Sequence, residues 1–306
     1  MVSTYVPPAM TLTQVLSVFT LPDTIGDIVV RGFSIDSRAI GQGDIFVAMA
    51  GVHVHGEKYI PQAIDQGASA VFVNADNGLS VRYENNTPII ALPSLGKILS
   101  HIVGQFYGHP TQSLPVIGIT GTNGKTTCSQ LYAQISALDG KLSGVIGTNG
   151  YGLCRVRKTA DGMCSAHTEL TSTGMTTPEA ITVQSICASL SAAGSENIVM
   201  EVSSHGLEQD RVAAIDFDGA IFTNLSHDHL DYHGTMVAYG EAKSKLFISP
   251  SLSFAIINLD DAFAKALLAK IHHDVRVITY STQDSSADLY LSNITYQASS
   301  TQAELH

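Results

Sequence analysis

A glycine-rich loop between an apolar run and a helical pattern limits what this chain can fold into more than any other feature. Residues 115–120 read as a buried strand, and residues 142–146 read as another. Between them lie the loop residues Gly121, Thr122, Asn123, Gly124, Lys125, Thr126 and Thr127. The loop leads into a predicted helix whose apolar face carries Cys128, Leu131, Tyr132 and Ile135. This order of strand, loop, helix and strand predicts a βαβ unit.

The loop has the residue types that hold a nucleotide phosphate. Backbone N–H groups and the helix dipole converge on an anion at such a strand-to-helix turn. Lys125 can reach the terminal phosphates, and the Thr126 hydroxyl can ligate Mg²⁺. The usual phosphate-loop pattern would need glycine where Ile119 stands, so the loop is a shortened variant. The alternative is an ordinary turn between a strand and a helix.

The remaining apolar runs predict an α/β protein of two domains. Residues 1–93 read as a small N-terminal α/β domain. Residues 94–306 read as a P-loop-type central domain with a mostly parallel, doubly wound sheet, because continuous apolar strands alternate with helices. Its further strands are predicted at 198–202, 220–223, 254–257 and 275–278. A helix over 95–107 and a Gly/Pro break at 108–110 mark the junction.

Charge and cysteine usage narrow the partners and the compartment. Lys and Arg number 16 against 27 Asp and Glu, a formal net charge of −11, which argues against nonspecific binding to nucleic acid or to an anionic membrane. No apolar stretch reaches the ~18 residues that span a bilayer, and Pro7 and Pro8 interrupt the segment where a signal peptide would lie. The cysteines form no CxxC pair, which fits free thiols in a reducing compartment. We expect a cytoplasmic monomer that acts on small molecules.

Glu201 is the one carboxylate in an otherwise apolar predicted strand. The carboxyl ends of the strands line the ligand crevice of a doubly wound sheet, and a glutamate there can hold Mg²⁺. The alternative is a strand-end glutamate that faces water.

Lys243 lies on an apolar helical stripe with Met236, Tyr239 and Leu246. An inward lysine is costly unless it is paired or chemically changed. The alternative is an amine that extends along the apolar surface to the solvent.

Histidine and aspartate are concentrated in residues 226–233, which read SHDHLDYH. The segment approaches the HxHxDH pattern of metallo-hydrolases, but Tyr232 separates Asp231 from His233, so the spacing is off by one. A zinc hydrolase is therefore an alternative, and a polar loop of hydrogen-bonded histidines is another.

Together these segments resemble the Mur ligase family from about residue 33 to residue 260. The phosphate loop alone would fit folylpolyglutamate synthetases equally well. The segments 203–207 and 228–234 are typical of the family members that add the third residue of the peptide. The other matching segments are 36–38, 43–48, 59–64, 222–226 and 242–243.

The resemblance implies a reaction. ATP would phosphorylate the side-chain carboxylate of D-Glu in UDP-MurNAc-L-Ala-D-Glu. The amine of a diamino acid, meso-diaminopimelate by this resemblance, would then attack the acyl phosphate to form an amide, ADP and phosphate. Such a reaction needs charge neutralisation and alignment of the attacking group.

The resemblance also implies the site residues. Residues 121–127 would hold the ATP phosphates, and the catalytic residues would be Lys125, Glu201, His229 and a carbamylated Lys243. Mg²⁺ would lie among Thr126, Glu201, His229 and the Lys243 carbamate, an anion that would explain the inward lysine. The UDP moiety would be faced by Ile35, Ser37, Val52, His53 and Val54. The UDP-MurNAc-dipeptide would be held by Thr176, Thr177, Ser203, Gln209 and Arg211.

The family's C-terminal domain has no counterpart in these residues. The tail over 298–306 follows a strand-like run and contains no closing helix. We therefore expect a C-terminally truncated ligase whose central domain is incomplete and which is inactive alone. Two alternatives stay open: a nucleotide-binding or UDP-sugar-binding module without catalysis, and a ligase that adds L-lysine.

Overall fold

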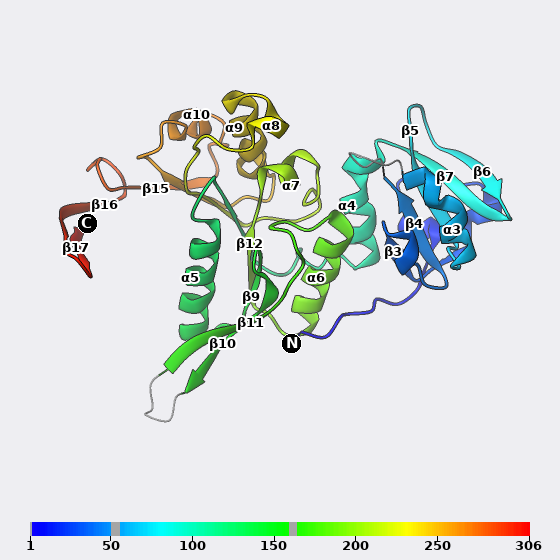
Figure 1. The fold of residues 1–306 in the computed structure, drawn as a ribbon, viewed down its shortest axis with the longest axis horizontal. Coiled ribbons are helices and arrows are strands. Elements are labelled where there is room, and N and C mark those ends of the chain that lie inside the picture. The colour runs from blue at the N-terminus through cyan, green and yellow to red at the C-terminus, as the bar shows by residue number, and fades with distance from the viewer. Residues whose placement is uncertain (1, 50–55, 159–163) are drawn as a thin grey trace.

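A computed structural model describes residues 2–49, 56–158 and 164–306, which form an N-terminal unit and a larger central unit (Figure 1). The N-terminal unit has a five-stranded sheet in the order β3-β4-β5-β7-β6, parallel except for β6. Its strands are β3 (Gly32–Ser34), β4 (Asp44–Ala48), β5 (Ala70–Ala75), β6 (Ser80–Glu84) and β7 (Thr87–Pro93). A two-stranded sheet of β1 (Met10–Thr11) and β2 (Val29–Val30) lies beside it.

The N-terminal sheet buries both faces, as the alternation of β4 shows. Ile45 and Val47 join the apolar cluster of helices α1 (Leu12–Val15) and α4 (Leu95–Phe106), whereas Phe46 and Ala48 join the cluster of α3 (Ile60–Asp65). Successive side chains of a strand point to opposite faces, so one short strand serves two cores. The short helix α2 (Asp23–Gly26) completes this unit.

Helix α4 connects the two units. Its residues Leu95, Leu99 and Phe106 lie in one apolar cluster with the N-terminal sheet, and Ile181 of α6 (Ala180–Ala192) belongs to the same cluster. This packing joins α4 to both units. The boundary between residues 93 and 94 stays a prediction.

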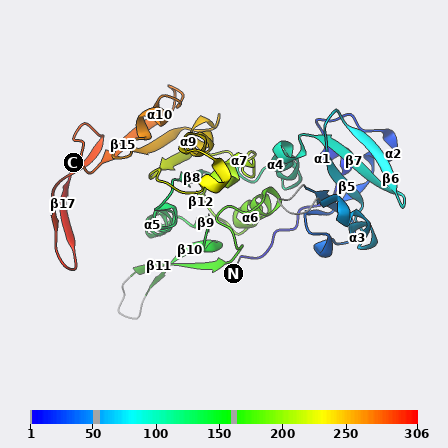
Figure 2. The same cartoon turned by 45° about the horizontal axis from the view of Figure 1, so that its top comes forward.

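The central unit has a ten-stranded sheet in the order β11-β10-β9-β12-β8-β13-β14-β15-β16-β17, seen from two directions in Figures 1 and 2. The strands from β9 to β16 in that order are parallel, whereas β10 pairs antiparallel with both β9 and β11, and β17 pairs antiparallel with β16. Their bounds are β8 (Val116–Thr120), β9 (Ser143–Gly147), β10 (Gly150–Lys158), β11 (Cys164–Thr171), β12 (Asn197–Glu201), β13 (Gly219–Phe222), β14 (Phe254–Asn258), β15 (Arg276–Ser281), β16 (Leu289–Tyr296) and β17 (Thr301–Leu305). The mostly parallel, doubly wound sheet predicted from the sequence is confirmed.

Helices cover both faces of the parallel strands. Helix α5 (Lys125–Leu138) packs on one face with Ile117, Ile119 and Val199, and α6 packs on the other with Ile198 and Met200. The chain leaves β8 toward β9 on one side and later returns to β13 on the other side. Doubly wound proteins bind ligands at such a reversal, in a crevice outside the carboxyl ends of the strands, which here means the carboxyl end of β8.

The predicted apolar face of α5 is confirmed for Cys128 and Tyr132, which pack against the core, and wrong for Leu131 and Ile135. Leu131 is 51% exposed and Ile135 is 66% exposed, whereas Ser129, Ala133 and Ala137 are buried against the sheet. Small side chains let the helix axis approach the sheet closely, and the fixed entry of the helix from the phosphate loop determines which face turns inward. A prediction from hydrophobicity alone therefore placed Leu131 and Ile135 on the buried face, although they face outward.

Four α-helices follow β12. They are α7 (Ser204–Glu208), α8 (Leu230–His233), α9 (Met236–Ser244) and α10 (Ala264–Leu268). The predicted stripe of α9 is confirmed for Tyr239, Lys243 and Leu246, each 1% exposed. In the part of the chain that the structure describes, no helix is long and apolar enough to cross a membrane.

Candidate active site

The phosphate loop is held from the end of β13. Gly121 has φ +151° and Gly124 has φ +87°, and a Cβ on Gly121 would collide with the Thr223 hydroxyl. The Thr122 N–H donates to the backbone oxygen of Asn224 (2.8 Å), and the Asn123 N–H donates to its side-chain oxygen (3.0 Å). The neighbouring strand thus fixes the shape of the loop.

Lys125 folds back over the loop. Its ammonium donates to the backbone oxygens of Gly121 (2.8 Å) and Thr122 (3.0 Å). Burial lowers the pKa of Lys125, and the carboxylates of Glu201 and Asp228 partly oppose that change. A cation whose only acceptors are weak backbone oxygens is well placed to exchange them for phosphate oxygens.

Glu201 ends β12 beside the loop and is 1% exposed. Its carboxylate accepts hydrogen bonds from the Thr126 hydroxyl (2.7 Å), the Thr148 N–H (3.1 Å) and the Thr148 hydroxyl (3.1 Å). The alternative prediction of a strand-end glutamate that faces water is therefore wrong. Thr148 was missed at the sequence level, although glycines at 147 and 150 mark the sharp turn after β9 that brings it here.

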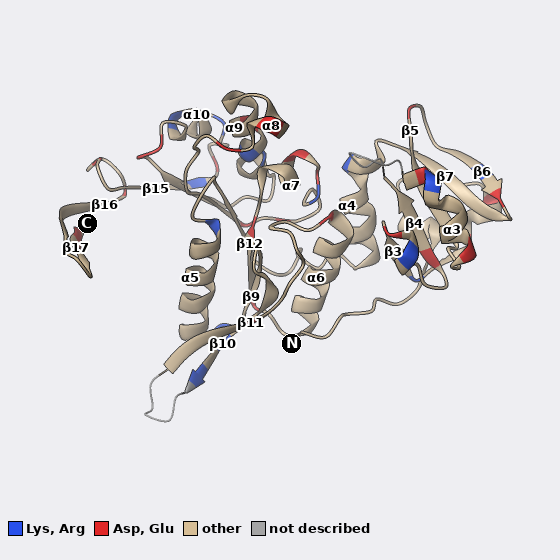
Figure 3. Cartoon of the chain, viewed as in Figure 1, with Lys and Arg blue, Asp and Glu red and all other residues tan. Residues whose placement is uncertain are grey.

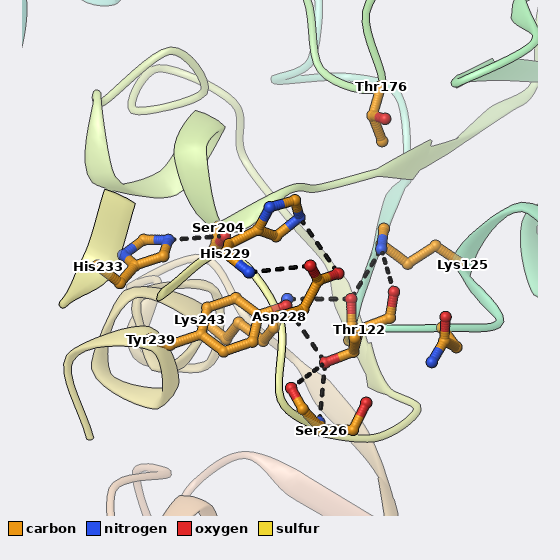
Figure 4. A network of polar contacts seen from close by, with 12 residues as sticks. Thr122, Lys125, Thr176, Ser204, Ser226, Asp228, His229, His233, Tyr239 and Lys243 are labelled. Atoms are coloured by element: carbon orange, nitrogen blue, oxygen red, sulfur yellow. Dashed lines mark hydrogen bonds and ion pairs between the residues drawn. The ribbon is translucent and has the colours of Figure 1, made fainter. Parts of the chain in front are cut away.

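Lys243 points from α9 to the underside of the loop (Figure 4). It is 1% exposed, its amine donates to the backbone oxygen of Gly121 (3.0 Å), and it lies 4.4 Å from the ring centroid of Tyr239. Burial, reinforced by the nearby charge of Lys125, lowers the pKa of Lys243 to about 7. The alternative of an amine reaching solvent is wrong, and the inward position leaves a group that is half neutral near pH 7.

His229 lies at the start of α8 with φ +51°. Its backbone N–H donates to an Asp228 carboxylate oxygen (2.9 Å), and its Nε2 is 3.6 Å from the other oxygen. Among the hydrogen bonds of residues 2–49, 56–158 and 164–306, none joins His229 to Thr126 or Glu201. The structure thus brings Thr126 and Glu201 together beside the loop, and within the described residues it shows no hydrogen bond from His229 to either of them.

Aromatic rings surround His229. His205 stacks near Tyr232 (centroids 4.2 Å apart) and meets the ring of His229 edge-on (5.0 Å), and the His233 Nε2 is 2.9 Å from the buried Ser204 hydroxyl. Burial lowers the pKa values of both His205 and His233. A metal site needs several His, Cys, Asp or Glu ligand atoms close together. Within the described residues, three such atoms lie within 4.8 Å of one another at the exposed His272, His273 and Asp274, and residues 227–233 contain no such group. The geometry gives no support to a zinc hydrolase.

The predicted dipeptide-binding residues of the central unit lie together. The Thr177 hydroxyl accepts from the Ser203 N–H (2.9 Å) and donates to the backbone oxygen of Glu201 (3.0 Å). Arg211 donates to the backbone oxygen of Thr177 (2.7 Å) and to the Gln209 side-chain oxygen (2.6 Å). Hydrogen bonds thus connect the backbone of Glu201, through Thr177, to the guanidinium of Arg211.

The predicted UDP-binding residues of the N-terminal unit are separate from these residues. Ser37 is buried and donates to the Gln62 side-chain oxygen (2.8 Å), while Ile35 is 44% exposed. Val52, His53 and Val54 lie outside the described residues. Charged residues of both signs are interspersed along the described elements (Figure 3).

The chain is similar to known ligases over both units. Residues 119–306 match the Mur ligase middle domain, and residues 29–107 match the Mur ligase family catalytic domain. UDP-N-acetylmuramoyl-L-alanyl-D-glutamate--2,6-diaminopimelate ligases of Pseudomonas aeruginosa and Ectopseudomonas mendocina are 45% and 44% identical to it, over 88% and 93% of this chain. These alignments cover 52% and 55% of the relatives, so the chain spans about half of their length.

Solved structures agree with the sequence relatives. The solved structure of a ligase with the same name has a TM-score of 0.80 at 30% identity. The match covers 97% of this chain and 57% of that chain. A MurF ligase of Thermotoga maritima in complex with ADP shares the fold at a TM-score of 0.59 and 20% identity, with coverage of 90% of this chain and 56% of that one.

Proposed function

The chain belongs to the Mur ligase family, and on that premise we propose that it carries the substrate-binding and ATP-binding parts of a peptidoglycan-precursor ligase. The proposed reaction joins meso-diaminopimelate to the D-Glu side-chain carboxylate of UDP-MurNAc-L-Ala-D-Glu at the expense of ATP. The names of the relatives support diaminopimelate over L-lysine. We place the reaction in the cytoplasm, with small molecules as the substrates of a monomer; free thiols at all four cysteines agree with that compartment.

One observation carries the proposal: a preformed phosphate loop lies beside a buried carboxylate. Residues 121–127 lead into the start of α5, Lys125 provides a positive charge, and Glu201 is 2.7 Å from the Thr126 hydroxyl. Phosphoryl transfer needs positioning and charge neutralisation more than covalent help from the protein. The crevice provides both at one place.

Hard oxygen donors fit a magnesium ion. The Thr126 hydroxyl and the Glu201 carboxylate are ligands of the kind that Mg²⁺ takes in nucleotide sites, together with phosphate oxygens and water. When bound there, Mg²⁺ would neutralise phosphate charge on ATP. His229 is proposed as a further ligand on the strength of the family resemblance.

Lys243 fits the donor set only after chemical change. Its neutral amine can attack CO₂ and lose a proton, which converts a buried ammonium into a carbamate anion. An ammonium 3.0 Å from the Gly121 oxygen would repel a cation, whereas a carbamate would help to hold one. We therefore propose that Lys243 acts as a carbamate, and intact mass in CO₂-replete buffer should show one added CO₂ that Lys243→Met removes.

In the proposed sequence of steps, Lys125 holds the terminal phosphates while the D-Glu carboxylate attacks the γ-phosphorus and ADP leaves. The diamino acid's amine then attacks the acyl carbon, and phosphate departs. Arg211, Gln209 and the 176–177 segment would orient the dipeptide, because hydrogen bonds join them to one another and to the backbone of Glu201. Ser203, Ile35, Ser37 and the 52–54 segment are proposed for the rest of the substrate from the resemblance.

The test is ADP release with ATP, UDP-MurNAc-L-Ala-D-Glu, meso-diaminopimelate and Mg²⁺, measured on a protein with the length of the relatives. Lys125→Ala should abolish turnover, and Lys265→Ala, on the distant helix α10, is the matched control. Unchanged turnover in Lys125→Ala would contradict the proposal.

A second candidate is a binding module, favoured by the chain's spanning about half of its relatives. The 306-residue chain would then bind nucleotide or UDP-sugar without turnover. Calorimetry with each ligand, run beside the ADP assay, separates the two; turnover by the 306-residue chain would exclude the module.

A further inference from the structure

We infer that Thr148 is a positioning residue that fixes the Glu201 carboxylate and couples it to the dipeptide-binding segment 176–177. This inference rests on the proposed function for the identity of the ligands. The contacts that carry it belong to the ligand-free chain. They link two surfaces that otherwise come from different parts of the sequence.

Thr148 makes two of the three hydrogen bonds on a buried carboxylate. Its N–H donates to Oε1 of Glu201 and its hydroxyl to Oε2, each at 3.1 Å, while Thr126 donates to Oε2 at 2.7 Å. A buried carboxylate needs such donors, because the alternative is an uncompensated charge. Two donors from one residue, one on each oxygen, fix the orientation of the carboxylate plane.

The protons of the hydroxyl groups define a directed chain. The Thr148 hydroxyl is 2.9 Å from the Thr176 hydroxyl. A hydroxyl has a single proton, and Thr148 uses it on the carboxylate, so Thr176 must donate to Thr148. The order is therefore Thr176 to Thr148 to Glu201, and removal of the middle hydroxyl breaks this path to the carboxylate.

The 176–177 segment touches Glu201 a second time. The Thr177 hydroxyl donates to the backbone oxygen of Glu201 at 3.0 Å, so neighbouring threonines reach both the side chain and the backbone of one residue. A shift of this segment on binding the dipeptide would be transmitted to the carboxylate through Thr148.

The turn after β9 is built for this contact. A Cβ on Gly147 would collide with Oε1 of Glu201, and Gly150 has φ +117°. Thr148 itself is exposed at the carboxyl ends of the strands, so its hydroxyl lies between the buried carboxylate and the open crevice. The contact with Glu201 thus needs a residue without a Cβ at position 147 and a hydroxyl at position 148.

The experiment compares Thr148→Val, which keeps the shape and the N–H, with Thr148→Ser, which keeps the hydroxyl. Asn149→Ala, at the exposed next position in the turn, is the control. In ligand-free protein, hydrogen exchange over 174–177 and 197–203 should rise in Thr148→Val and remain unchanged in Thr148→Ser and Asn149→Ala. Equal exchange in all variants would overturn the inference without reference to any ligand.

Nucleotide binding provides the second readout. A fluorescent ATP analogue with Mg²⁺ should bind about tenfold more weakly to Thr148→Val, the loss of one hydrogen bond to a charged group, and equally well to Thr148→Ser. The effect of Thr148→Val and that of Thr176→Val should not add, because both cut the same chain. Additive losses would overturn the coupling, whereas failure of the unchanged chain to bind the nucleotide would instead overturn the proposed function.

Discussion

Replacing Lys243 by methionine should stabilise the ligand-free chain. Methionine has nearly the volume of the lysine stem and no charge, so it suits a site that is 1% exposed. The lysine's pKa falls from its ordinary 10.5 to about 7 in the folded chain, mainly through burial. Folding therefore forces a proton off this amine, and methionine removes that cost.

The magnitude follows from linkage. Unfolded Lys243 holds its proton below 10.5 and the folded residue holds it only below about 7, so between those values the unfolded state binds more protons and stability rises with pH. The slope is about 1.4 kcal/mol per pH unit, and the full cost, reached below pH 7, is about 4–5 kcal/mol. Loss of the hydrogen bond to Gly121 costs Lys243→Met about 1 kcal/mol. The variant's free energy of unfolding should therefore exceed that of the wild type by about 3 kcal/mol at pH 7.

The assay is urea unfolding at pH 7, 8 and 9, followed by circular dichroism in CO₂-free buffer so that no carbamate forms. The gain should shrink as the pH rises, because the wild-type penalty disappears toward 10.5. Lys245→Met is the control, since that amine makes an exposed ion pair with Glu208 (3.0 Å) worth little to stability. Parallel pH profiles for wild type and Lys243→Met would refute the reasoning.

Three further predictions test the structure around the site. Gly147→Ala should lower the melting temperature and weaken nucleotide binding, since its Cβ would meet the strand-end carboxylate, whereas Gly96→Ala, with its nearest contact at 3.5 Å, should be neutral or stabilising. Thiol labelling at pH 8 should modify exposed Cys164 at once and Cys187 only after unfolding, because burial raises the pKa of Cys187 to about 12; rapid labelling of both would contradict the packing. Ile135→Ala should change the free energy of unfolding by less than about 1 kcal/mol, and a loss of several would restore the sequence-based face of α5.

The sequence predicted those features that depend on local pattern. The loop between β8 and α5, the apolar strands and the inward Lys243 are each written in neighbouring residues, so residue type and spacing were enough. The proposed phosphate chemistry of the loop rests on Gly121, Lys125 and Thr126, because phosphate sites of this kind use a contiguous segment, and it stays a prediction.

Features that depend on contacts between distant segments could not be predicted. Thr148 reaches Glu201 across 53 residues of sequence, and no pattern in either segment announces the pairing. The buried face of α5 was predicted only in part, because Ala133 and Ala137 gain their burial from close approach to the sheet rather than from their own hydrophobicity. The β10–β11 hairpin arises from a stretch for which no element was predicted.

The anchoring of the phosphate loop to Asn224 has a consequence for the speed of nucleotide capture. Because the N–H groups of Thr122 and Asn123 already donate to Asn224, the shape of the loop is set before a nucleotide arrives, and the expected change on binding is that the Lys125 side chain leaves its backbone acceptors. Side-chain rotation is far faster than a loop rearrangement. Association should therefore proceed in a single kinetic phase whose rate rises in proportion to nucleotide concentration, with no slow step of loop closure to limit it.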